Sequence, residues 1–299
     1  MRKPRNAVTP WLLSSPAWLL YLLLLAVPLA ATLLLSLRTF DATRGTWSGS
    51  GSGLTNYLVI LGDTYFHTIF ARTFALAAMV ALLCVLIGTP EAYILSRMRA
   101  PWRGLFLIAV LGPFLISVVV RTLGWSVLFG ANGPVSLGLQ TLGWVNEPVS
   151  LLYTMAGMVI ALVHVLVPFV VIAVWVALQG CDPDVEHAGT SLGAGQWTVV
   201  RRLVLPQIVP GIVSGSAVVF SLAATAFATP AIIGGRRLTV VATAVYDQFF
   251  GTLDWPTGAA LAVLLLAANL LILTTYQRLV ERQRRAPRPV QPVLKEARS

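Results

Sequence analysis

Charged side chains are scarce in this sequence. Asp, Glu, Lys and Arg together make up 11% of its 299 residues, whereas hydrophobic residues make up 57%. Soluble domains usually contain roughly 25% charged and 45–50% apolar residues, so a water-soluble fold of this length could not bury so much apolar surface. Several apolar runs reach the roughly 20 residues that cross a hydrocarbon core. The composition therefore indicates a membrane protein and excludes a soluble domain.

Catalytic and nucleotide-binding patterns are also missing. The sequence has no Gly-x-x-x-x-Gly-Lys-Ser/Thr loop for nucleotide phosphates, no His-Glu-x-x-His pair and no paired aspartates at membrane depth. It therefore predicts no catalytic residues, no metal site and no bound cofactor, and it argues against an intramembrane enzyme. Cysteine is rare as well. Cys84 and Cys181 fall at different expected depths, so no disulfide between them is expected.

Long apolar runs are what the sequence has instead. Backbone hydrogen bonds must be satisfied internally within the bilayer, so each run predicts a helix. The fold class is therefore an all-α polytopic membrane protein with about six transmembrane helices. The runs lie at about 11–37, 68–95, 104–124, 151–178, 207–230 and 256–277. The first run exceeds the roughly 7–15 residues of a signal-peptide core, so we expect a retained helix.

Basic residues predict the orientation. Fifteen of the 21 Lys and Arg residues fall on one side of the membrane if the helices alternate, and the positive-inside rule then places both termini in the cytoplasm. Residues 1–10 are a cytoplasmic N-terminus, 11–277 a single transmembrane domain with a cytoplasmic loop at 179–206, and 278–299 a basic tail that is expected to be disordered. The net charge of +10 indicates this orientation and contact with membrane lipid, not nucleic-acid binding.

The longest internal cytoplasmic connection, residues 179–206, contains helix signals. Asp182 or Asp184 can cap a helix that has Pro183 in its first turn. Gly193 can adopt the positive φ that ends such a helix. The segment therefore predicts a helix, a glycine turn and a second helix.

Small and apolar residues are expected on the surfaces of these two helices. They are Ala188, Gly189 and Leu192 in the first helix, and Trp197, Val200 and Leu203 in a second, short amphipathic helix. Pro206 would then open the next membrane helix. A small-residue face lets another protein approach closely, so this loop is a candidate docking site.

The loop resembles the signature loop of permease subunits of binding-protein-dependent ABC importers. That signature has Glu-Ala-Ala, three residues, Gly, nine residues, Ile, any residue, and Leu-Pro. Aligned on Gly193, the nine-residue spacing leads to Leu203, followed by Leu205 and Pro206. The resemblance implies that this loop is the coupling helix that fits a cleft on a separate ATPase subunit.

The resemblance departs from the family at its first position. His187 stands where the family has its Glu, and Gly189 where it has its second Ala. Glu186 lies one residue too early, and one residue rotates a helical side chain by about 100°, so Glu186 cannot simply replace the family glutamate. The resemblance assigns the following residues to the ATPase-coupling loop: Glu186, His187, Ala188, Gly189, Leu192, Gly193, Leu203, Leu205 and Pro206.

Further segments are similar to the spermidine/putrescine-type permeases. They are Gly88–Arg97, Val120-Arg121-Thr122 with Trp125, Asn132-Gly133, Asn146-Glu147-Pro148, Leu151–Thr154 and Asp254–Ala260. The resemblance implies a type I ABC importer permease fold in a bacterial cytoplasmic (inner) membrane. It implies four kinds of partner: two cytoplasmic ATPase copies that use ATP and Mg²⁺, a second homologous permease, an extracytoplasmic substrate-binding protein, and membrane lipid.

Ionisable residues inside membrane helices are costly and are therefore candidates for contact with the cargo. The path candidates of this kind are Arg121 and His164. Further path candidates are Tyr246, Asp247 and Asp254, which lie on the external side before the last helix and would suit a cation passed from an outside receptor. The carbonyl freed near Pro168 could instead accept a hydrogen bond from His164, and Arg121 could anchor at the membrane interface. The neighbouring Arg97 and Arg99 favour a snorkelling or ion-paired structural role for Glu91.

The cargo expected from the resemblance is a polyamine or a similar small organic solute. Related permeases for phosphonate, sulfate or iron complexes are the alternatives. The charges on the external side nearly balance, so they do not decide the sign of the cargo. An ion-coupled secondary transporter is disfavoured because the sequence shows neither repeated halves nor broken helices in matching positions.

Overall fold

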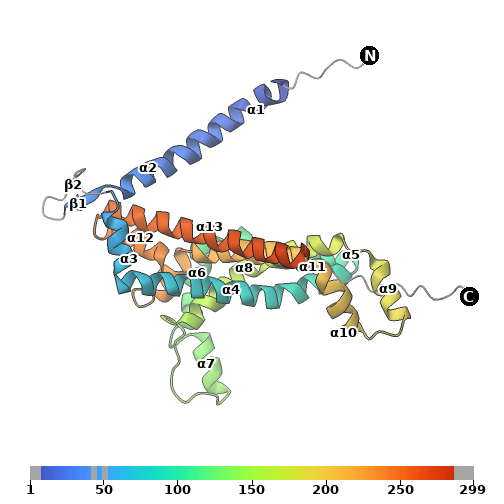
Figure 1. Cartoon of the computed structure of the whole chain (residues 1–299). Coiled ribbons are helices and arrows are strands. Elements are labelled where there is room, and N and C mark those ends of the chain that lie inside the picture. The colour runs from blue at the N-terminus through green and yellow to red at the C-terminus, as the bar shows by residue number, and fades with distance from the viewer. Residues whose placement is uncertain (1–7, 42–45, 49–52, 286–299) are drawn as a thin grey trace, which may run out of the picture. The chain divides into compact units, whose positions relative to one another are not determined.

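Helices dominate the computed structural model of the chain, which describes residues 8–41, 46–48 and 53–285 (Figure 1). Within these ranges, five helical segments are long and apolar enough to cross a membrane. They are built from α1 (Val8–Tyr21) with α2 (Val27–Ser36), α4 (Thr64–Arg97), α8 (Met155–Gln179), α11 (Leu205–Ala224) and α13 (Trp255–Arg285). A π-helical turn at Leu22–Ala26 joins α1 to α2.

The third apolar run is broken, so the expected single helix at 104–124 is wrong. It consists of α5 (Ala100–Leu111), a 3₁₀ turn at Gly112–Leu115 and α6 (Val118–Phe129), with a bend of 96° between the two halves. Proline in the 3₁₀ turn lacks an N–H, and Ser117 adopts an extended ψ of 134°, so helical hydrogen bonding stops there. Counted as one span, this pair brings the described spans to six.

The described residues between the first two apolar runs have regular structure. The strands β1 (Thr39–Asp41) and β2 (Thr46–Ser48) pair antiparallel, and α3 (Thr55–Gly62) follows. The Tyr57 hydroxyl lies 2.6 Å from Ser36 Oγ, and the Asn56 amide donates to the Ser36 carbonyl at 2.9 Å. These bonds attach α3 to the end of α2.

Two compact groups of residues make up the described structure. One group comes from residues 1–71 with 240–266, and the other from residues 72–239 with 267–299. The first contains α12 (Val241–Phe250), and the second contains α7 (Pro134–Thr141) and a π-helical turn at Pro230–Gly234. Helix α13 continues to Arg285, so the expected disorder of the tail is wrong for 278–285, and residues 286–299 lie outside the described residues.

Helix α8 forms the centre of the second group because small residues let two neighbours approach its backbone. A Cβ added at Gly211 of α11 would lie 2.7 Å from the Ala173 carbonyl oxygen, and one at Gly88 of α4 would lie 3.1 Å from Val170 Cβ. Lipid tails provide no hydrophobic drive between helices, so close packing of this kind stabilises their association. Figure 1 shows α8 and α11 side by side.

Candidate functional site

The first helix of the 179–206 loop forms as predicted. Helix α9 (Pro183–Ser191) has Asp182 as its N-cap, and Asp182 Oδ1 accepts a hydrogen bond from the Asp184 N–H at 3.0 Å. Pro183 lacks an N–H, but the first residues of a helix have no helical partner for an N–H, so nothing is lost. Asp184 and Glu186 lie in the first turn, where their negative charges interact favourably with the positive end of the helix dipole. The local sequence alone therefore explains where α9 begins.

Gly193 ends α9 with a positive φ of 84°, which confirms the predicted glycine turn. Its N–H donates to the Thr190 carbonyl at 2.9 Å, and the Ala194 N–H donates to the Gly189 carbonyl at 3.1 Å. This pair of bonds is the Schellman motif, in which a left-handed residue satisfies the last helical carbonyls. Residues with a Cβ are strained in this conformation, so the turn requires glycine.

The second helix of the loop is not separate from the membrane helix, so this part of the prediction is wrong. Helix α10 (Gln196–Val199) runs through a π-helical turn at Val200–Val204 into α11, and Pro206 lies in the first turn of α11. A hydrogen bond in a π turn spans one residue more than one in an α-helix. Here the Leu205 N–H donates to the carbonyl of Val200, five residues earlier. The apolar periodicity of this segment fits both a separate second helix and a helix continuous with α11.

Apolar side chains on the loop point in two directions. Val199 and Val204 are buried, whereas Leu192 is 89% exposed and Trp197 is 75% exposed. Leu192 and Trp197 therefore lie outside the packing of this chain, on the outer side of the loop.

Gly189 also has a structural role within the chain, which the family resemblance of the loop does not indicate. A Cβ at this position would lie 2.8 Å from Leu203 Cδ1 and 3.3 Å from Val199 Cγ2. The small residue therefore lets α9 pack on the helix that follows it. Ala188 remains exposed, so it alone of these two small residues keeps an outward-facing position.

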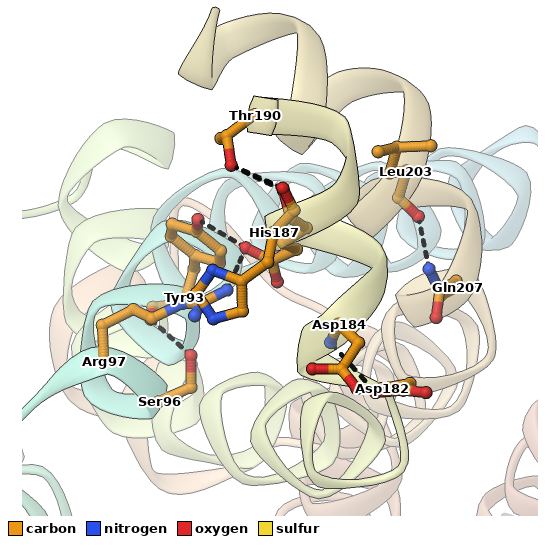
Figure 2. A network of polar contacts seen from close by, with 10 residues as sticks. Tyr93, Ser96, Arg97, Asp182, Asp184, His187, Thr190, Leu203 and Gln207 are labelled. Carbon is orange, nitrogen blue, oxygen red and sulfur yellow. Dashed lines mark hydrogen bonds and ion pairs between the residues drawn. The ribbon is translucent and has the colours of Figure 1, made fainter. Parts of the chain in front are cut away.

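Glu186 binds the end of α4 through Arg97 and Tyr93, two residues that Figure 2 labels. Its carboxylate forms an ion pair with the Arg97 guanidinium and accepts a hydrogen bond of 3.5 Å from the Tyr93 hydroxyl. Arg97 also lies over the Tyr93 ring, 5.3 Å from its centroid. Arg97 thus pairs with Glu186, whereas ion pairing with Arg97 or Arg99 was one of the structural roles expected for Glu91. Sequence analysis missed Tyr93 as a site residue, although its spacing of four from Arg97 puts both on one helix face.

His187 is exposed and borders a polar cavity beside this ion pair. The cavity measures about 400 Å³ and is lined by Tyr93, Arg97, Glu186, His187, Thr190, Gln196 and Val199. The His187 carbonyl accepts a hydrogen bond from the Thr190 hydroxyl at 2.9 Å, as Figure 2 shows, so its backbone is fixed while its imidazole faces outward. The position of the family glutamate therefore carries an exposed imidazole beside the ion pair.

Two of the path candidates lie together in the second compact group. The Trp125 indole N–H donates to His164 Nδ1 at 3.4 Å, and the two rings meet edge to face at 5.4 Å. This bond replaces the predicted one to a carbonyl near Pro168. Arg121, one turn before Trp125 on α6, donates through Nη2 to the Ile116 carbonyl at 3.0 Å. Its Nε and Nη1 are buried and have no hydrogen-bond partner among the described residues.

The other path candidates belong to the first compact group. Asp254 caps α13, because its Oδ1 accepts the Thr257 N–H at 3.1 Å, which gives it a structural role. Tyr246 and Asp247 lie on α12, and the Tyr246 ring contacts Phe250 at a centroid distance of 4.8 Å. The predicted path residues are therefore divided between the two groups. Trp125, which was not among them, lies beside His164.

Comparison with known proteins agrees with this architecture. Residues 102–285 match the family described as binding-protein-dependent transport system inner membrane component. The chain is 26% identical over 262 residues to the spermidine/putrescine transport system permease protein PotB of Haemophilus influenzae, covering 88% of this chain and 90% of that one. It is 28% identical over 267 residues to the sulfate transport system permease protein CysT of Escherichia coli, covering 87% and 90%.

Solved structures give the same fold. One chain of a bacterial ABC transporter involved in the import of the acidic polysaccharide alginate superposes with a TM-score of 0.76 at 16% identity, covering 91% of this chain and 96% of that one. A chain of the MetNI methionine ABC transporter superposes with a TM-score of 0.57 at 17% identity, covering 74% and 98%. The chain therefore belongs to the family of binding-protein-dependent transport system inner membrane components, and it is a multi-pass permease subunit of an ABC importer in the inner membrane.

Proposed function

We propose that this subunit forms half of the translocation path of an ATP-driven importer whose cargo is a polyamine such as spermidine or putrescine. The observation that supports this cargo is the similarity to PotB, which extends over 88% of the chain. The subunit performs no chemistry and binds no cofactor itself. ATP and Mg²⁺ are used by two copies of a cytoplasmic ATPase.

The loop around α9 couples this subunit to the ATPase. Leu192 and Trp197 are exposed apolar side chains beside an exposed His187, which suits insertion into a cleft of another protein. Helix α9 is joined directly to α8 and, through α10, to α11. Closure of an ATPase pair around α9 would therefore move the two helices that form the centre of the second compact group.

Transport proceeds by alternating access in a complex with three other kinds of chain. A substrate-binding protein delivers the cargo from outside, a second homologous permease supplies the other half of the path, and ATP-driven closure of the ATPases opens the path outward. ATP hydrolysis then returns the helices to the inward-open state. The coupling requires that ATP-bound ATPase bind one of these two states more tightly than the other.

A second cargo class, an oxyanion, is supported by one observation at the path. Arg121 has two buried guanidinium nitrogens without hydrogen-bond partners among the described residues, and anionic oxygens are the strongest acceptors for such donors. The sulfate permease CysT is also similar over 87% of the chain. A cationic polyamine would be repelled by Arg121 unless an acidic group accompanied it.

The deciding experiment measures ATPase stimulation of the reconstituted complex by its own binding protein. Spermidine, putrescine, sulfate and phosphonate are each added with the binding protein, and the rate is compared with that of the ligand-free binding protein. Stimulation by polyamines supports the main proposal. Stimulation by sulfate or phosphonate alone replaces it with the oxyanion cargo. If the cargo is an oxyanion, Arg121→Gln is expected to abolish its uptake, whereas polyamine uptake under the main proposal should survive the same substitution.

A further inference from the structure

Helix α9 is held to the membrane helices at a third point, besides its two chain connections. The chain itself joins α9 to α8 through Gly180 and Cys181, and to α10 through the Gly193 turn. The third attachment is the ion pair of Glu186 with Arg97, which lies 89 residues earlier in the sequence at the end of α4. The two residues are far apart in the chain, so the backbone alone does not make α4 move with α9.

We propose that Glu186, Arg97 and Tyr93 form a clasp that transmits the movement of α9 to α4. This proposal rests on the proposed coupling of α9 to an ATPase and adds a specific route for that coupling. The three side chains are positioning residues, because they act through the helices and touch neither cargo nor nucleotide. The clasp makes α4 a third moving helix, beside α8 and α11.

The geometry of the clasp favours transmission of force in a fixed direction. Two donors four residues apart on one face of α4 converge on a single carboxylate, and the Arg97 guanidinium also lies over the Tyr93 ring. Ser96 Oγ donates to the Tyr93 carbonyl at 2.6 Å. The Glu186 side chain is only 17% exposed, so its carboxylate is largely shielded from water. While both contacts persist, a movement of this carboxylate is passed to the helix that holds it.

The pair is too exposed to serve mainly as a source of stability. The Arg97 side chain is 44% exposed, and partly exposed ion pairs contribute about 0–1 kcal/mol. The adjoining polar cavity of about 400 Å³ also leaves this region loosely packed. A contact of low stabilising value with defined geometry is better suited to linking two moving helices than to holding a rigid core.

Helix α4 has a suitable point at which to bend. Pro90 lies inside it, and proline removes one backbone hydrogen bond and weakens a helix at that position. Two residues earlier, Gly88 packs closely on Val170 of α8. A pull on Arg97 would therefore move the last two turns of α4 about a fixed point at Gly88, opening or closing that end of the helix.

The test compares coupling in clasp variants of the complete complex reconstituted with its partners. Glu186→Gln and Arg97→Gln each break the ion pair, and the double variant Glu186→Arg with Arg97→Glu restores it with reversed charges. Asp184→Asn and Arg103→Gln are matched controls, because each removes a charge from the same loop or from the neighbouring α5. The readout is the number of ATP molecules hydrolysed per spermidine or sulfate molecule taken up.

Each single clasp variant is expected to raise this ratio about fivefold or more, corresponding to a coupling energy of about 1 kcal/mol. The charge-reversed pair should restore most of the wild-type ratio, and the two controls should leave it unchanged. Single variants that lower only the melting temperature, with an unchanged ratio, would overturn the clasp. Failure of the wild-type complex to respond to its binding protein would instead overturn the proposed function.

Discussion

Glycine serves opposite purposes in the membrane helices and in the cytoplasmic loop. In α11, Gly211 lies so close to α8 that a Cβ would come within 2.6 Å of Ala177 Cβ. In the loop, Gly193 has no neighbouring atom within 4 Å of its would-be Cβ but adopts a φ of +84°. The first glycine is required by contact and the second by backbone conformation. The membrane part is therefore specified by packing, and the loop by its own backbone, which leaves its outer surface available to a partner.

The largest effect is expected from filling the helix contact. Gly211→Leu would force α8 and α11 apart, because a Cβ also meets the Ala173 carbonyl oxygen at 2.7 Å. Overpacking typically costs about 1–3 kcal/mol, and the contact with backbone places this variant at or above the upper end. We expect loss of folded protein, measured as the yield of monodisperse protein in detergent.

Gly104→Leu is the matched control for this variant. Its would-be Cβ has no neighbour within 4 Å, and it lies in the helix α5. It should give the wild-type yield. Equal yields for the two variants would contradict the view that α8 and α11 require contact between their backbones.

The next effect is expected at the loop turn. Gly193→Pro fixes φ near −65° and removes the N–H that donates to Thr190, so α9 cannot end as it does. We expect wild-type yield in the membrane, with loss of cargo uptake and of binding-protein-stimulated ATPase activity. Gly193→Ala keeps the N–H and should cost only about 1–2 kcal/mol for the left-handed backbone, with partial activity. A fully active proline variant would remove the loop from the coupling route.

Sequence reasoning was strongest where local chemistry alone decides the structure. A cap at Asp182 or Asp184 and a turn at Gly193 follow from residue type and spacing, and the structure has the cap at Asp182 and the turn at Gly193. The break of the third apolar run near Ser117 was not predicted, because hydropathy measures how apolar a run is and not whether it bends. Because this helix is broken, unbroken helices do not exclude a secondary transporter, and the match to the family of binding-protein-dependent permeases excludes it instead.

Contacts between distant segments could not be predicted from the sequence. The position of Glu186 one residue before the family glutamate was visible, but its partner Arg97 depends on how α9 docks on α4. The same holds for Trp125 and His164, which meet only because α6 and α8 pack together. A spacing of four residues would have grouped Arg121 with Trp125, yet it could not identify the third member.

A smaller effect is expected where the loop uses packing as the membrane helices do. Gly189→Leu would collide with Leu203 Cδ1, which is 2.8 Å from the would-be Cβ. The colliding atom is the end of a flexible side chain, so α9 should shift and the protein should still fold. We expect reduced uptake at wild-type yield, measured in proteoliposomes. Adding Leu203→Ala should restore part of the uptake, and the lack of any rescue would show that Gly189 is needed for contact with another protein.

The smallest effect concerns the thiol at the start of the loop. Burial, and to a lesser extent the carboxylate of Glu186, raise the pKa of Cys181, so less thiolate is present at neutral pH than for an ordinary cysteine. Glu186→Gln removes the second cause and lowers this pKa. Alkylation by iodoacetamide in a Cys84→Ala background should then become modestly faster near pH 8. The difference should vanish at a pH above both pKa values, where each thiol is ionised. If instead the rate rises equally at every pH, Glu186→Gln has opened the loop, and the charge of Glu186 is not what slows the reaction.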